Sequence, residues 1–130
     1  MIDIALEGYD ELVRKIGDAA SQDILIDPMQ ASLYLIQRYM ADYSLLPKKP
    51  DNGHRTGTLG RRWVAGTPTK IGGGVRGEVG NNTSYGPWVQ SAQFQVPWHR
   101  GFWQTDEMAF RVLDPEINKT FDSAIQRALN

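Results

Sequence analysis

The chain has 130 residues, no cysteine, a net charge of −1 and 41% hydrophobic side chains. This length predicts one domain, residues 1–130, and the missing cysteines exclude disulfide frameworks and thiolate metal sites. No apolar run approaches the ~20 residues of a membrane-spanning helix, and Asp3 and Glu7 stand where a secretory signal peptide carries bases.

The charges are unevenly distributed along the chain. Residues 48–76 hold seven bases and one acid, Asp51, whereas residues 1–47 hold eight acids against three bases and residues 77–130 six against four. Such a block is a solvated face, or a contact with an acidic neighbour or with nucleic acid. Its basic residues are Lys48, Lys49, Arg55, Arg61, Arg62, Lys70 and Arg76.

The N-terminal region predicts a strand and a short helix. Apolar residues alternate with other residues over 2–7, which is typical of a half-buried strand. Leu12, Val13 and Ile16 share one helical face and predict a helix that ends near Ser21.

Asp27-Pro28 predicts the start of a central helix of about eighteen residues, because Asp caps helices and Pro fits their first position. Pro47 is expected to end it. Its apolar stripe consists of Met29, Leu33, Ile36, Met40 and Tyr43.

Two strands and two loops are predicted next. The polar segment 48–58 is expected to be a mobile loop. Residues 62–65 and 77–79 read as strands, and the glycine-rich segment 67–74 joins them as a hairpin loop that is expected to project from the body.

The stretch VGNNTSYGPWVQ, residues 79–90, leaves a strand and breaks at Gly80-Asn81-Asn82, which suits a tight turn or positive φ. Pro87 then fixes the entry to a helical segment. We expect Tyr85 to be a buried anchor and Trp88 a more exposed contact.

An aromatic loop, residues 91–105, follows. Six of the thirteen aromatic residues lie between positions 85 and 103. They form a secondary core, a protein interface, or a platform on which bases or sugars stack. The candidate interface residues are Arg61, Arg62, Tyr85, Trp88, Phe94, Trp98, Arg100, Phe102 and Trp103.

Thr105 or Asp106 is expected to cap a turn, and Asp114-Pro115 repeats the helix-start signal. The stripe Ile117, Phe121, Ile125 and Leu129 predicts a C-terminal helix. The fold class is therefore α+β: a small, mostly antiparallel sheet with a long central helix and the C-terminal helix packed on one face.

The sequence shows no catalytic signature. The glycines of 72–77 match G-x-G-x-x-G, but a strand and a turn follow them where a nucleotide site needs a helix. His54 and His99 lack a second ligand at helical spacing, and no serine sits in a nucleophile elbow. We expect no enzyme, no cofactor and no metal.

Four segments carry a resemblance to a known family. TGTLGRR (56–62) resembles a "TG-x-L-x-x-S" element, and residues 79–90 resemble "VG-x-x-x-x-YA-x-x-x-E/Q". LEGYDEL (6–12) and HRGFWQT (99–105) match two further elements in the same order. Together they resemble the tail-completion, or minor tail, proteins of long-tailed bacteriophages, the gene-product-ten-like family of Hong Kong-type phages, similar to the lambda Z protein.

The resemblance implies a structural virion protein, encoded by a phage or prophage and assembled in the host bacterial cytoplasm. It implies a homo-oligomeric ring at the neck, where it completes the tail and joins it to the head. The implied partners are further copies of the chain and the tail terminator, tail tube or head connector. Arg62 departs from the family serine and Gly86 from its alanine, so interface details need not carry over.

Two competing functions stay open. A nucleic-acid-binding protein would use the basic residues of 48–76 and the loop aromatics, and would bind DNA with a steep dependence on salt. A toxin or small-molecule-binding domain would need a pocket lined by Trp88, Trp98 or Trp103, with convergent polar groups. We expect neither a membrane partner nor specific nucleic-acid binding.

Overall fold

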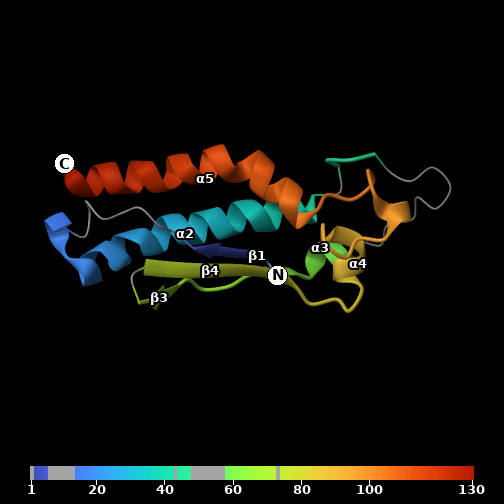
Figure 1. The fold of residues 1–130 in the computed structure, drawn as a ribbon, viewed down its shortest axis with the longest axis horizontal. Helices are drawn as coiled ribbons and strands as arrows, with labels where there is room; N and C mark the ends of the chain where they lie inside the picture. Colours follow the sequence, from blue (N-terminus) through green and yellow to red (C-terminus); the bar gives the residue numbers. More distant parts are fainter. Residues whose placement is uncertain (1, 6–13, 43, 48–57, 73) are drawn as a thin grey trace.

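A computed structural model describes residues 2–5, 14–42, 44–47, 58–72 and 74–130. Two long helices lie on one side of a small antiparallel sheet, so the fold is α+β, as predicted (Figure 1). The elements are β1 (Ile2–Ala5), α2 (Asp18–Ala41), α3 (Thr58–Arg61), β2 (Trp63–Ala65), β3 (Thr69–Ile71), β4 (Gly74–Asn81), α4 (Gly86–Gln90), the 3-10 helix η1 (Pro97–His99) and α5 (Asp106–Leu129).

Strand β4 is the centre of the sheet and pairs antiparallel with the other three strands. Val79 pairs with both Ile2 and Ala65, so β1 and β2 lie on opposite edges of β4. Arg76 pairs with Ala5 of β1 and with Thr69 of β3, which places β3 on the same edge as β2.

Strands β2 and β3 are two halves of one edge strand, interrupted by a bulge. Four positions separate Ala65 from Thr69, whereas three separate their partners on β4, Val79 and Arg76. One extra residue on one strand is the signature of a β-bulge, which bends the strand and increases its twist. The amide of Gly66 still donates to the carbonyl of Glu78, at 2.8 Å.

The expectation that 67–74 projects from the body is wrong. Thr69–Ile71 form a strand, and the Gln22 side chain on α2 donates to the carbonyls of Ile71 (2.7 Å) and Gly74 (3.0 Å). Lys70 also forms an ion pair with Asp23 of α2. These contacts hold the hairpin against the helix.

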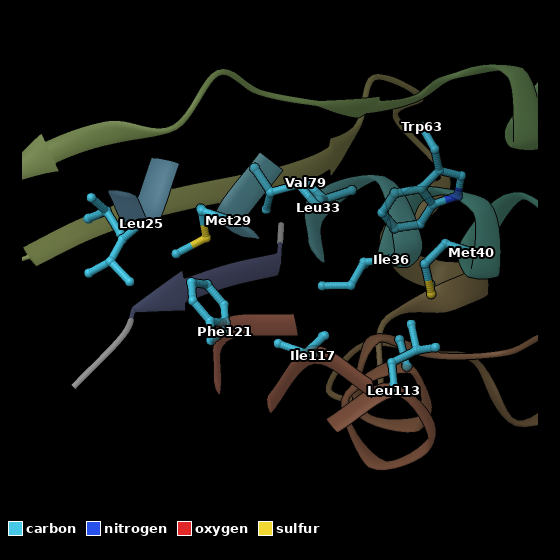
Figure 2. Packing of buried hydrophobic residues seen from close by; sticks show 12 residues of the cluster. Leu25, Met29, Leu33, Ile36, Met40, Trp63, Val79, Leu113, Ile117 and Phe121 are labelled. Carbon is cyan, nitrogen blue, oxygen red and sulfur yellow. The ribbon is translucent and has the colours of Figure 1, made fainter. Parts of the chain in front are cut away.

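Helix α2 covers β4 with a fully buried stripe that extends the predicted one toward the N-terminus. It consists of Leu25, Met29, Leu33, Ile36 and Met40. Gly77 allows the close approach of helix and strand, because a Cβ there would lie 2.7 Å from Cδ1 of Leu33 and 3.0 Å from Sδ of Met29. Figure 2 shows this stripe pointing into one cluster with Val79 and Trp63.

Helix α5 packs along α2 and completes the core. Leu113, Ile117 and Phe121 are buried in the same cluster as the α2 stripe (Figure 2). Ile125 and Leu129, the other members of the predicted stripe, are partly buried against it. The C-terminal helix and its inward face are therefore confirmed.

Both Asp-Pro pairs lie inside helices, so the predicted helix starts at Asp27 and Asp114 are wrong. Helix α2 begins at Asp18 and α5 at Asp106, with Pro28 and Pro115 in their interiors. Thr105 is the N-cap of α5 and accepts a hydrogen bond from the amide of Met108 at 3.3 Å. The predicted cap is therefore the start of the whole helix.

Burial explains these early starts. Ser21 and Leu25 precede Met29 at helical spacing, and all three are fully buried. Burying these side chains stabilises a helix that continues through Pro28, and this stabilisation outweighs the hydrogen bond lost at the proline. Gly17 separates α2 from a helical turn at residues 14–16, with φ of 87°.

The expected helix up to Ser21 therefore stops at Gly17 among the described residues, and its first part, residues 9–13, lies outside them. Helix α2 ends at Ala41 and not near Pro47. The predicted mobile loop 48–58 also lies outside the described residues, except for Thr58, which begins α3.

Candidate protein interface

The turn that follows β4 is built by one asparagine side chain. The Asn81 Oδ1 atom accepts hydrogen bonds from the backbone amide (2.9 Å) and the hydroxyl (2.6 Å) of Thr83, and its amide donates to the carbonyl of Leu59 (2.8 Å). Among the described residues, positive φ occurs only at Gly17 and Gly101. The break thus relies on side-chain hydrogen bonds, which Asn favours in turns, and not on positive φ.

Helix α4 presents one face outward and one inward. Val89 and Gln90 are buried, whereas Trp88 is 53% exposed, as predicted. Tyr85 is 44% exposed, so its predicted role as a buried anchor is wrong. Tyr85 and Trp88 are three residues apart and share the outward face.

Gln90 takes the role that we expected of Tyr85. Its side chain is 1% exposed and joins two elements. The Oε1 atom accepts a hydrogen bond from the indole Nε1 of Trp63 at 2.9 Å, and Nε2 donates to the carbonyl of Met40 at 3.1 Å. The carbonyls of the last helical turn lack intrahelical partners, so Gln90 caps α2 while it anchors α4.

Gln104, near the C-terminal end of the aromatic loop, caps the same end of α2. Its Nε2 atom donates to the carbonyls of Tyr39 and Asp42, both at 2.7 Å, and of Met40 at 3.4 Å. It is 1% exposed. Sequence reasoning missed both glutamines because they bond to backbone groups that are distant in sequence, which leaves no motif.

Tyr39 and Asp42, at this end of α2, have shifted pKa values. Burial raises the pKa of the Tyr39 phenol, an effect that the positive charge of Arg111 opposes. Hydrogen bonds from the hydroxyl and amide of Ser44 lower the pKa of the Asp42 carboxyl. The carboxylate of Asp42 therefore stabilises the turn that ends the helix.

The aromatic loop is ordered by a third glutamine. The Nε2 atom of Gln95 donates to the carbonyls of Val89 (2.7 Å) and Trp103 (3.2 Å), which joins the start of the loop to its end. The backbone amide of Gln95 donates to the carbonyl of Ser91 (2.7 Å), and the backbone amide of Val96 donates to the carbonyl of Trp88 (2.9 Å). The loop is thus closed on itself next to α4.

The structure divides the six clustered aromatics into two groups. Phe102 and Trp103 are half-buried, as a secondary core would require. The other four are exposed, up to 63% for Trp98, and the Trp88 and Phe94 rings meet edge to face at 6.0 Å. We call these four residues, Tyr85, Trp88, Phe94 and Trp98, the aromatic surface.

The candidate arginines lie at the same end of the molecule. Arg61, Arg62 and Arg100 are exposed. The carbonyl of Arg62 accepts a hydrogen bond from Asn82 at 3.2 Å, beside the turn that leads into α4. Figure 1 shows α3 and α4 together at this end.

The rest of the basic block does not extend this surface. Lys70 pairs with Asp23, and Nη2 of Arg76 lies 3.9 Å from the carboxylate of Glu78. Lys48, Lys49 and Arg55 lie outside the described residues. The block is therefore not one continuous basic face in the described part of the chain.

A small hollow of about 190 Å³ lies beside the aromatic surface. Trp63, Gly86, Gln90, Phe94 and Asp106 contribute to its walls. Binding sites for small molecules usually enclose about 300–1,000 Å³. The tryptophans that a small-molecule site was expected to use, Trp88, Trp98 and Trp103, do not line this hollow.

The described residues contain no group of three His, Asp or Glu side chains placed to hold a metal ion. The second half of the glycine motif, Gly74–Gly77, lies within strand β4. It therefore does not lead into a helix N-terminus, as phosphate binding would require. In the same part of the chain, no helix combines the length and the apolar character that a membrane span needs.

Comparisons with models of protein families, with curated sequences and with solved structures found no significant match. Within the described part of the chain, the aromatic surface and its flanking arginines are the feature best suited to binding another protein, because Trp, Tyr and Arg dominate protein-binding hot spots.

Proposed function

We propose that this chain is a structural subunit that assembles with copies of itself through the aromatic surface. In the role that the motif resemblance implies, it forms a ring at the neck of a long-tailed phage or prophage particle. There it completes the tail and meets the tail terminator, tail tube or head connector. The proposal is carried by one observation: Tyr85, Trp88, Phe94 and Trp98 are exposed on a segment that the hydrogen bonds of Gln95 hold in place.

The size of the aromatic surface fits a protein partner. An aromatic side chain buries about 150–250 Å², so four that are roughly half exposed offer on the order of 400 Å². This summed area is about half of the ~800 Å² that each partner buries in a standard interface. Flanking polar residues would supply the rest.

The rigidity of the loop also supports binding. Gln90, Gln95 and Gln104 tie α4 and the aromatic loop to each other and to α2 before any partner arrives. Ordering a flexible loop costs free energy on association. A surface ordered in advance avoids that cost and favours stable assembly.

The competing nucleic-acid function makes a different prediction. It needs a basic surface whose counterions are released on binding, so that affinity falls steeply with salt. Lys70 and Arg76 pair with acids, which favours the assembly proposal. Titration of single- and double-stranded DNA at two salt concentrations tests this: tight binding with a steep salt slope would support the nucleic-acid function instead.

The assembly proposal is tested by sedimentation velocity over a concentration series, together with negative-stain images of the associated fraction. Trp88→Ala and Trp98→Ala are each expected to weaken association at least roughly tenfold, as hot-spot truncations do, with an unchanged melting temperature. Tyr34→Ala is the matched control, because Tyr34 is 52% exposed on α2, outside the aromatic surface.

A strict monomer at high concentration, or association that neither tryptophan variant weakens, would contradict the proposal. A large fall in melting temperature for both variants would instead assign these side chains to the core. Images of the protein mixed with tail-tube or connector protein then test the neck position, since ring-shaped particles at tube ends are the expected result.

A further inference from the structure

A second surface lies between the N-terminal half of α2 and the C-terminal half of α5. It is an open groove of about 450 Å³. Its apolar floor consists of Ile24, Pro28, Ala124 and Ala128, and Asp23, Asp27 and Arg127 stand at its rim. We call this groove the α2–α5 groove.

The α2–α5 groove and the aromatic surface lie at opposite ends of the molecule. Figure 1 shows the start of α2 and the end of α5 together at one end of the long axis, and α3 and α4 at the other. When the aromatic surface of one copy contacts the groove of a second copy, the first copy still has a free groove and the second still has a free aromatic surface. Such a head-to-tail contact repeats, and it forms a ring when the rotation closes.

Each surface carries an exposed charge that has no partner in the described part of the chain, and these charges are opposite in sign. Arg62 and Arg100 flank the aromatic surface, are exposed, and form no ion pair with another described residue. At the groove, Asp23 already pairs with Lys70 and Arg127 stands on the same rim, whereas Asp27 is exposed and pairs with no described residue. An arginine from one copy and Asp27 from the next can therefore meet without breaking an existing pair. Charge pairs of this kind set the register of an interface.

The two surfaces also match in polarity. Trp98 and Trp88 are exposed on one surface, and the groove offers small and apolar side chains on which an indole can lie. We propose that the aromatic surface of one copy docks into the α2–α5 groove of the next, with Arg100 facing Asp27. This inference rests on the proposed function and specifies which two surfaces meet.

Charge reversal gives the sharpest test. Asp27→Arg and Arg100→Asp are each expected to weaken self-association at least tenfold in sedimentation velocity at low salt. Mixing the two variants is expected to restore association, because each remaining contact then joins an arginine to an aspartate. Glu116→Arg, at an exposed site on α5 outside the groove, is the matched control and is expected to associate normally.

Cross-linking tests the same contact by the proximity of the two residues and does not depend on charge reversal. The chain has no cysteine, so Asp27→Cys and Arg100→Cys each introduce a single thiol. Mild oxidation of the mixed variants is expected to give a disulfide between the two different variants. Lys119→Cys, exposed on α5, is expected to give none with either of them.

The outcomes separate this inference from the proposed function. If Trp88→Ala weakens association but Asp27→Arg does not, the head-to-tail contact is overturned and assembly through the aromatic surface stands. A disulfide formed mainly between two copies of Arg100→Cys would indicate a face-to-face contact of aromatic surfaces and would also overturn it. If the wild-type chain does not associate at all, both proposals fall.

Discussion

Gln90 and Gln104 donate hydrogen bonds to the same carbonyl oxygen, that of Met40, at 3.1 Å and 3.4 Å. One residue ends α4 and the other ends the aromatic loop, so the segment between them is fastened at both ends to the C-terminus of α2. The position of the aromatic surface on the body therefore depends on two buried amides.

Gln104→Ala is expected to lower the free energy of unfolding by about 1–3 kcal/mol, because it removes the hydrogen bonds of a buried amide that holds the end of α2. Gln104 donates to three carbonyls, those of Tyr39, Met40 and Asp42. Urea unfolding measures the change. Gln93→Ala, at an exposed site in the same loop, is the control and is expected to change stability little. Equal stabilities of the two variants would show that the cap contributes nothing.

Pro115→Ala is expected to raise stability by roughly 1–3 kcal/mol. Pro115 is exposed in the interior of α5, where it lacks the amide that would bond to the carbonyl four residues earlier. Alanine restores that bond and sacrifices little packing. Thermal unfolding tests this against Glu116→Ala, which is expected to change little, and an unchanged or lower stability for Pro115→Ala would contradict it.

Gly77→Ala is expected to destabilise the fold by about 1–3 kcal/mol through overpacking. The added Cβ would lie 2.7 Å from Cδ1 and 2.9 Å from Cδ2 of Leu33, whose side chain is fully buried and would have to shift. At Gly72 an added Cβ meets nothing within 4 Å, so Gly72→Ala is the control for the loss of glycine. Chemical unfolding measures the free energy of unfolding of both variants. Equal losses of stability would mean that α2 moves to make room for the added Cβ without cost.

The carboxylate of Asp42 contributes a pH-dependent stabilisation. Because Ser44 lowers its folded-state pKa, the contribution is present above the ordinary pKa of aspartate, about 3.9, and is lost as the pH falls through the lowered value. The difference in melting temperature between wild type and Asp42→Asn is therefore expected to shrink as the pH falls from neutral to about 3. A difference that stays constant over this range would exclude the contribution.

The strands could be predicted from the sequence, because alternation and turn residues act within a few positions. Trp63–Ala65 and the end of β4 lie where expected. The prediction of 67–74 as a projecting loop was wrong because Gln22 and Asp23, distant in sequence, hold that hairpin. Local patterns contain no information about such partners.

The aromatic segment shows the same division. Its composition and the outward direction of Trp88 followed from the sequence, but Tyr85 is exposed and Gln90 is the buried anchor. An apolar residue is a sound choice for burial when no partner is known. Here the end of α2 offers carbonyls that need hydrogen-bond donors, and the buried amides of Gln90 and Gln104 supply them.

Periodicity and composition are properties of neighbouring residues, so the α+β class, the apolar faces of both long helices and the clustering of aromatics follow from the sequence alone. Where the helices begin depends on tertiary packing, since burial of Leu25 and Ala109 extends them past their Asp-Pro signals. The anchoring of the stretch 79–90 depends on it as well, because Gln90 bonds to Met40, 50 residues away in the sequence.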